Sequence, residues 1–135
     1  MTDRKLDETL TTSPQIHPDE LEAIAAAGFR AVISNRPDGE EPGQPSAAEM
    51  KAAAEAHGLE FRHIPVTVGA IGPDAIQAMA EALDTLPGPI FGFCRSGTRT
   101  AMLWALARAP ASDPDTLIAA ARDAGYDLSG LRSRL

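Results

Sequence analysis

The chain has 135 residues, of which 44% are hydrophobic and 4% aromatic, and its formal net charge is −7. This length fits one domain, so we expect residues 1–135 to form a single folded unit with its own core. The acidic balance argues against nucleic acid or an anionic membrane surface as a partner. No stretch approaches the roughly 18 consecutive apolar residues of a membrane helix.

The sequence contains one cysteine and three scattered histidines. One cysteine cannot form an internal disulfide, and the first ten residues lack the apolar core of a signal peptide, so we expect a cytoplasmic protein. No zinc-ligand pair occurs at a recognised spacing, and we therefore expect neither a metal nor a cofactor. The sequence carries no prediction of the oligomeric state.

Apolar segments and turn residues alternate along the first part of the chain in a β–α rhythm. Residues 7–13 can form a short edge strand, residues 17–28 a helix, and residues 29–35 a buried strand. The next segment, RPDGEEPGQP at 36–45, holds three prolines and two glycines and is predicted to be a loop. Its length is at the upper end for an α/β connection, which indicates a functional surface.

The same rhythm continues to the end of the chain. Helices are predicted at 46–58, 72–86, 98–108 and 113–125, strands at 59–66 and 89–93, and a final turn in the tail. Strands separated by helices predict an α/β fold with a mainly parallel sheet of four to five strands and helices on both faces. Ligands bind such sheets outside the carboxyl ends of the strands.

Cys94 stands at one of these carboxyl ends, between the strand at 89–93 and the helix at 98–108. Gly97 permits a turn with inward N–H groups, and the helix adds its own unsatisfied N–H groups and positive dipole end. Arg99 can clamp an oxyanion through two N–H groups. We therefore predict Cys94 as a nucleophilic thiolate, Arg99 as its catalytic partner, and an anion-binding loop of Arg95, Ser96, Gly97, Thr98, Arg99 and Thr100. The plainer alternative is a buried cysteine beside a turn glycine.

Three segments resemble the phosphatase-like domain of the beta-lactamase-hydrolase-like protein family. They are FRAVISNRPDGEEPGQPS, FRHIPV and FCRSGTRTAMLW, and the resemblance extends from SPQIHPDEL to AGYDL. It implies a fold like that of the dual-specificity and tyrosine phosphatases. It also implies one of two activities, because some members are described as phosphatases and others as sulfurtransferases that act through a cysteine persulfide.

The spacing of the loop favours sulfur transfer. Tyrosine-type phosphatases use His-Cys, five residues and then Arg, whereas Phe93 precedes Cys94 here and four residues separate Cys94 from Arg99. The string CRSGTR resembles the six-residue loop of rhodanese-type sulfurtransferases. Thr100 falls where a phosphatase would have its arginine, and its hydroxyl can also donate to the thiolate, as the Ser or Thr after the arginine does in phosphatases.

A missing acid favours the same chemistry. Dual-specificity phosphatases carry a general-acid aspartate a few residues after the IPV-type strand, where this chain has Thr67 and Val68. Asp74, the next acid, fits the cap of the following helix. We therefore expect a sulfurtransferase that takes sulfane sulfur from thiosulfate or a small persulfide onto Cys94. The alternative is a phosphatase that hydrolyses phosphate monoesters through a Cys94 phosphocysteine. A third interpretation is a non-catalytic module that senses an anion or a persulfide.

Four residues outside the loop are candidate accessory residues: Asn35, Arg36, Asp38 and His63. Arg36 can bind an anion, Asp38 can orient Arg36 or Arg99 or serve as an acid, and His63 can act as an acid or a base. Ordinary turn chemistry around Pro-Asp-Gly, and a hydrogen-bonded histidine, are the structural alternatives. The acidic run from 38 to 41 is expected to be a solvated rim.

Overall fold

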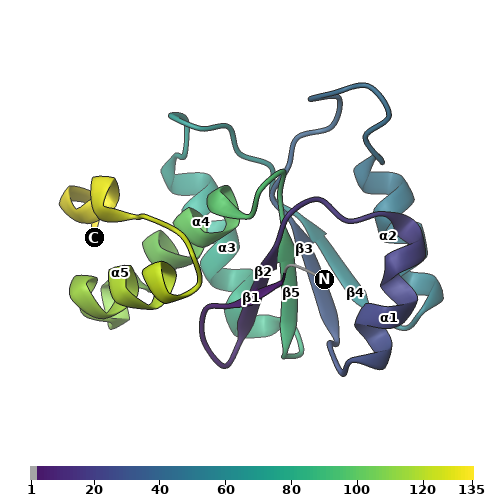
Figure 1. Ribbon diagram of the computed structural model, residues 1–135, viewed down its shortest axis with the longest axis horizontal. Coiled ribbons are helices and arrows are strands. Elements are labelled where there is room, and N and C mark those ends of the chain that lie inside the picture. The colour runs from purple at the N-terminus through teal and green to yellow at the C-terminus, as the bar shows by residue number, and fades with distance from the viewer. Residues whose placement is uncertain (1–2) are drawn as a thin grey trace.

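The computed structural model describes residues 3–135 (Figure 1). Residues 1 and 2, which begin the segment considered above for a signal peptide, lie outside them. Five strands form one sheet in the order β1-β2-β5-β3-β4. The strands β2 (Leu10–Ser13), β5 (Ile90–Phe93), β3 (Ala31–Ser34) and β4 (Glu60–His63) are parallel, and β1 (Arg4–Lys5) runs antiparallel to β2. The prediction of a mainly parallel sheet is confirmed.

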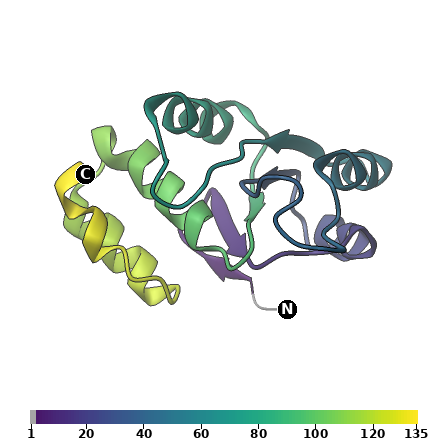
Figure 2. The same ribbon diagram turned by 90° about the horizontal axis from the view of Figure 1, so that it is seen from above.

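Helices cover both faces of the sheet, as predicted (Figures 1 and 2). On one face lie α1 (Leu21–Ala26), which follows a 3₁₀ turn at Pro18–Glu20, and α2 (Ala47–Ala56). The other face carries α3 (Pro73–Thr85) and α4 (Thr98–Arg108), and α5 (Pro114–Asp123) packs outside α4. Two further 3₁₀ segments, Ala109–Ala111 and Ser129–Arg134, lie on either side of α5.

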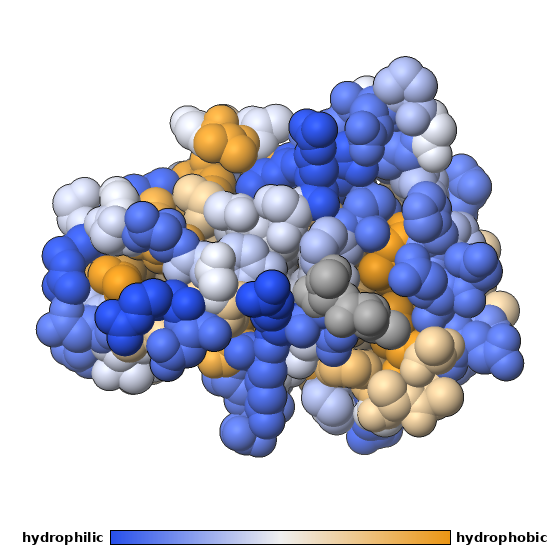
Figure 3. Space-filling view, in the orientation of Figure 1, coloured by the Kyte–Doolittle hydropathy of each residue, from blue (hydrophilic) through white to orange (hydrophobic). Residues whose placement is uncertain are grey.

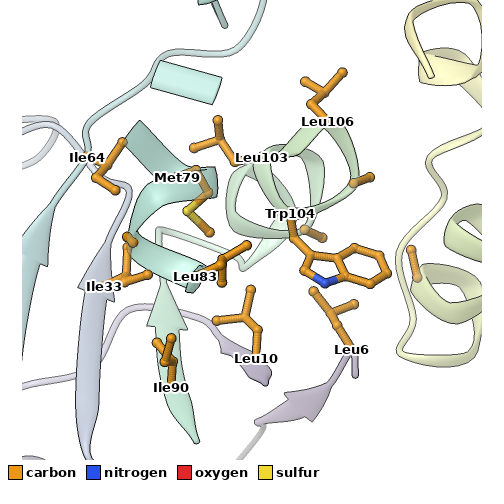
Figure 4. Packing of buried hydrophobic residues seen from close by; sticks show 14 of the residues in the cluster. Leu6, Leu10, Ile33, Ile64, Met79, Leu83, Ile90, Leu103, Trp104 and Leu106 are labelled. Carbon is orange, nitrogen blue, oxygen red and sulfur yellow. The ribbon is translucent and has the colours of Figure 1, made fainter. Parts of the chain in front are cut away.

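Side-chain alternation along the strands divides the core in two. Ile33 and Ile90 point to the α3 and α4 face, where they pack with Leu103 and other aliphatic residues (Figure 4). Val32 and Phe91 point to the opposite face and pack under α1 and α2. Both strands are buried on both faces, which accounts for their continuous apolar sequences.

The strand predicted at 7–13 is present as β2, but its predicted place at the edge is wrong, because the two-residue strand β1 covers its outer side. Asp7 makes the connecting turn: its Oδ1 accepts hydrogen bonds from the N–H groups of Thr9 and Leu10, each at 2.8 Å. Its Oδ2 accepts the indole N–H of Trp104 on α4 at 2.9 Å. One carboxylate therefore fastens the edge of the sheet to the helix that follows the Cys94 loop.

The surface is largely polar on the face shown in Figure 3, where apolar residues form small separate groups. Val68, in the loop after β4, is the one large apolar side chain with high exposure among residues 3–135, at 74%. Within the same range, no helix combines the length and the apolar character needed to cross a bilayer.

Candidate active site

The Cys94 loop leaves the carboxyl end of β5, which is flanked by β2 and β3. The chain continuing from β3 donates the N–H of Asn35 to the carbonyl of Phe93 at 2.9 Å, and the chain continuing from β2 donates the N–H of Gln15 to the carbonyl of Arg95 at 3.1 Å. The loops after β3 and β4 rise at the same end of the sheet (Figures 1 and 2). The loop is therefore held on both sides at the edge where ligands bind in such folds.

Cys94 is fully buried at the base of this loop. Its Sγ lies 3.0 Å from the backbone nitrogen of Gly97, which donates a hydrogen bond to the sulfur. Gly97 precedes α4 with a φ of +96°, a conformation in which glycine is favoured. One N–H of the loop is therefore aimed at the sulfur.

A tyrosine from the end of the chain lies against the outer side of the loop. The Tyr126 hydroxyl accepts a hydrogen bond from Thr12 Oγ1 at 3.0 Å and donates to the carbonyl of Ser96 at 3.4 Å. It also fills the space into which a Cβ on Gly97 would project. Tyr126 is 29 residues beyond Gly97, in the AGYDL segment that ends the resemblance, and nothing in that segment indicates this contact.

Arg99, in the first turn of α4, is 7% exposed. Its Nη1 donates to the carbonyl of Val66 at 2.9 Å and to Glu40 Oε2 at 2.7 Å, and its Nη2 donates to Glu40 Oε1 at 2.8 Å. The hydrogen bonds to Glu40 raise the pKa of Arg99 above its ordinary value, and the charge of the Cys94 thiolate acts in the same direction. The cation is therefore permanent, and it lies within the electrostatic range of the sulfur.

Glu40 binds a second arginine as well. Its Oε1 accepts from Arg36 Nε at 2.8 Å, while Arg36 also donates to Gln15 Oε1 and to Glu41 Oε1, each at 3.1 Å. The hydrogen bond from the Arg99 guanidinium is the main cause that lowers the pKa of Glu40 from 4.5 to about 2; burial acts in the opposite direction, and Arg36 lowers the pKa further. Glu40 is therefore an anion at neutral pH and cannot donate a proton to a leaving group.

Residues 38–41 are exposed, as predicted, but Glu40 and Glu41 are also ion-pair partners of arginine. The reason is a buried arginine: Arg36 is only 2% exposed, and a buried cation needs partners. The signal in the sequence was the spacing of four residues between Arg36 and Glu40 in a loop beside the predicted anion site. Asp38, which we expected to orient an arginine, instead accepts the backbone N–H of Ala47 at the start of α2.

Two other accessory candidates, Asn35 and His63, are hydrogen-bonded to backbone carbonyls. His63 Nε2 lies 2.8 Å from the carbonyl oxygen of Arg36. The Asn35 amide donates to the carbonyl of Ile64 at 3.0 Å and joins β3 to β4, while its Oδ1 has no partner among residues 3–135. The prediction that Asp74 caps the following helix is wrong, because Gly72 is the N-cap of α3 and Asp74 is exposed in its first turn. None of these side chains is placed against Cys94 by a hydrogen bond.

The remaining loop residues differ in exposure. Arg95 and Ser96 are exposed, and Ser96 Oγ is 3.0 Å from Thr98 Oγ1. Thr100 is fully buried, and its Oγ1 has no hydrogen-bond partner among the described residues, although we expected it to donate to the thiolate. Within residues 3–135, no three histidine, cysteine or carboxylate side chains gather in a way that could hold a metal ion.

Residues 3–111 match the protein family described as "Beta-lactamase hydrolase-like protein, phosphatase-like domain". The chain belongs to this family. A beta-lactamase hydrolase-like protein of Agrobacterium fabrum is 37% identical over 105 residues, which are 78% of this chain and 24% of that protein. The chain therefore spans about a quarter of the length of the curated relative that it matches.

Solved structures have the same fold. A candidate phosphatase from Neisseria meningitidis Z2491 is 37% identical and has a TM-score of 0.87. The match covers 99% of this chain and 96% of that one. A cysteine variant of P. aeruginosa TpbA in complex with pTyr is 16% identical with a TM-score of 0.66, over 98% of this chain and 88% of that one, and shows the fold alone. The phosphatase-like fold expected from the resemblance is confirmed.

These findings overturn the sulfurtransferase prediction. The matched family is phosphatase-like, and several solved neighbours are described as phosphatases. Thiosulfate and persulfide donors have no support among them. That prediction rested on the four residues between Cys94 and Arg99. Arg99 lies in the first turn of α4, and its guanidinium is close enough to Cys94 for the charge of the sulfur to affect its pKa. Loop spacing therefore does not identify the chemistry in this chain.

Proposed function

We propose that the chain hydrolyses phosphate monoesters through a Cys94 phosphocysteine. One observation carries the proposal: the Gly97 N–H is aimed at Cys94 Sγ, and the Arg99 cation stands at the same loop, in a chain of a phosphatase-like family. A thiolate supported by an oriented donor and a fixed cation is the arrangement needed for nucleophilic attack on a phosphoryl group. The predicted roles of Cys94 as nucleophile and Arg99 as phosphoryl clamp belong to this proposal.

The reaction has two steps. Sγ attacks phosphorus, the S–P bond forms, and the ester P–O bond breaks to release the alcohol oxygen with its electron pair. Water then attacks the phosphocysteine, the S–P bond breaks, and inorganic phosphate leaves with the thiolate regenerated. Arg99 holds two phosphoryl oxygens in both steps, and the N–H groups of the loop stabilise the charge that they gain.

The proposed substrates are small anions, and a phosphorylated tyrosine is the reference case because P. aeruginosa TpbA is solved with pTyr. A phenol oxygen also leaves with less need for a proton than an alkyl oxygen does. That difference matters here because Glu40 is ionised at neutral pH and Asp38 is bonded to α2. We therefore propose aryl phosphates as the ester class that this site hydrolyses fastest.

The test is hydrolysis of p-nitrophenyl phosphate, with intact-mass analysis of the rapidly quenched enzyme. We expect turnover and a transient gain of one phosphoryl group on the wild type, and neither with Cys94→Ser. Arg99→Lys should lower kcat/KM by about 10²–10³-fold, because an ammonium group cannot supply two parallel donors. Arg95→Lys is the matched control and keeps the charge at an exposed loop arginine. Turnover that survives Cys94→Ser would refute the proposal.

A further inference from the structure

We infer that Glu40 is a positioning residue of the proposed phosphatase site: its carboxylate holds the Arg99 guanidinium end-on and leaves the side edge of that guanidinium free for phosphoryl oxygens. This inference rests on the proposed function. Glu40 comes from the loop between β3 and α2, and the two side chains are 59 residues apart in the sequence. The contact joins two loops at the carboxyl end of the sheet.

The hydrogen bonds of Arg99 define which edge is free. A guanidinium has five N–H groups. Both Nη1 hydrogens are used, one by Glu40 and one by the carbonyl of Val66, and one Nη2 hydrogen is used by Glu40. None of these three hydrogen bonds uses Nε. The Nε–H and the second Nη2–H remain, and these two parallel donors match two oxygens of a phosphoryl group.

The Glu40 carboxylate is itself held by Arg36, which follows the end of β3. Its Oε1 is shared between Arg99 Nη2 and Arg36 Nε, both at 2.8 Å. Arg36 is 2% exposed, it donates to Gln15, and its carbonyl accepts from His63 in β4. An isolated surface ion pair would position Arg99 poorly, but this carboxylate is anchored through a buried cation.

A blocking role for Glu40 predicts different geometry and opposite kinetics. A carboxylate that competed with the substrate would occupy the edge that binds phosphate, whereas Glu40 occupies the end of the guanidinium and leaves the side edge open. Removing its charge would leave Arg36 and Arg99 less neutralised, and electrostatics alone would then tighten anion binding. If positioning dominates, the same change slows the reaction, so the two roles are separated by the sign of the effect on kcat.

The decisive variant is Glu40→Gln, assayed with an aryl phosphate and with two inhibitors. We expect kcat to fall by about 10–10²-fold, because misplaced catalytic groups cost rate rather than ground-state binding. Inhibition by orthovanadate, which mimics the five-coordinate transition state, should weaken in parallel, while inhibition by inorganic phosphate should not weaken. An undiminished kcat, or a parallel gain in phosphate and vanadate affinity, would overturn the inference.

Glu41→Gln is the matched control. It removes the same charge from the neighbouring residue, which contacts Arg36 but not Arg99. We expect its kcat to change less than about threefold, in keeping with a half-exposed ion pair. Thermal unfolding of each variant checks the fold. If Glu40→Gln does not fold, Glu40→Asp serves in its place, because it keeps the charge but is too short to span both arginines; a normal kcat would then refute positioning.

A second readout does not depend on turnover. In the wild type the Arg99 Nε–H should give a single sharp ¹⁵N-correlated resonance, because the guanidinium is fixed at its other end. In Glu40→Gln that resonance should broaden or exchange faster with solvent, and in Glu41→Gln it should not. Failure of the proposed function would appear as no hydrolysis by the wild type with this NMR difference intact. An unchanged Arg99 signal in Glu40→Gln would sink the positioning role alone.

Discussion

Gly97 donates its backbone N–H to Cys94 Sγ over 3.0 Å, and it does so with a φ of +96°. This conformation disfavours any residue with a Cβ by about 1–2 kcal/mol. The hydroxyl of Tyr126 occupies the position that such a Cβ would need. The donor to the sulfur is thus restricted to glycine by both the backbone conformation and the packing around it.

Gly97→Ala should therefore lose both stability and activity. We expect the free energy of unfolding to fall by more than the about 1–2 kcal/mol of φ strain, because Tyr126 must also move. The control is Gly58→Ala, at a φ of +76° with open space around the Cβ and a place at the end of α2. Urea unfolding and the aryl phosphatase assay compare the two. If the two variants lost equal stability and Gly97→Ala kept full activity, the role given to Tyr126 would be contradicted.

The pH dependence of stability should report the contact between Glu40 and Arg99. The pKa of Glu40 is about 2 in the folded protein against 4.5 ordinarily, so the unfolded chain binds the proton first. This contribution to stability is complete above about pH 4.5 and is lost as the pH falls towards about 2. Urea midpoints over this window should fall more steeply for the wild type than for Glu40→Gln. Glu55→Gln, on the exposed face of α2, should keep the wild-type slope.

Asp7→Ala should loosen α4 from the edge of the sheet. Its carboxylate accepts two backbone N–H groups and the indole N–H of Trp104, and hydrogen bonds to a charged group are the stronger class. We expect a loss of about 2–4 kcal/mol in the free energy of unfolding. Trp104 is the only tryptophan, so its fluorescence should also shift. Glu8→Ala, which breaks only an exposed pair with Lys5, should change neither reading by much.

Periodicity in the sequence predicted most of the fold because each long element buries a regular face. The strand at 29–35 and the helix at 98–108 were placed within two residues of β3 and α4. The two-residue strand β1 was missed, since Arg4 and Lys5 carry no apolar pattern and pair only because the Asp7 turn returns the chain.

The site was predicted less completely than the fold, for a different reason. Cys94 and Gly97 are three residues apart, so their relationship follows from local geometry. Glu40 and Tyr126 reach the loop from distant parts of the chain, and only the packed structure brings them there. The choice of chemistry failed for a related reason, because it rested on counting loop residues rather than on where Arg99 points.

The central position of β5 has a consequence for exchange of backbone protons with solvent. Because β5 is bonded to β2 on one side and to β3 on the other, its carboxyl end cannot open without breaking two ladders at once. The amides of β5 should thus be among the last in the chain to exchange for deuterium, whereas those of residues 36–45 and 67–71 should exchange early. Under the proposed function, differences in ester preference would then arise in these outer loops, while the strand that leads to Cys94 stays rigid.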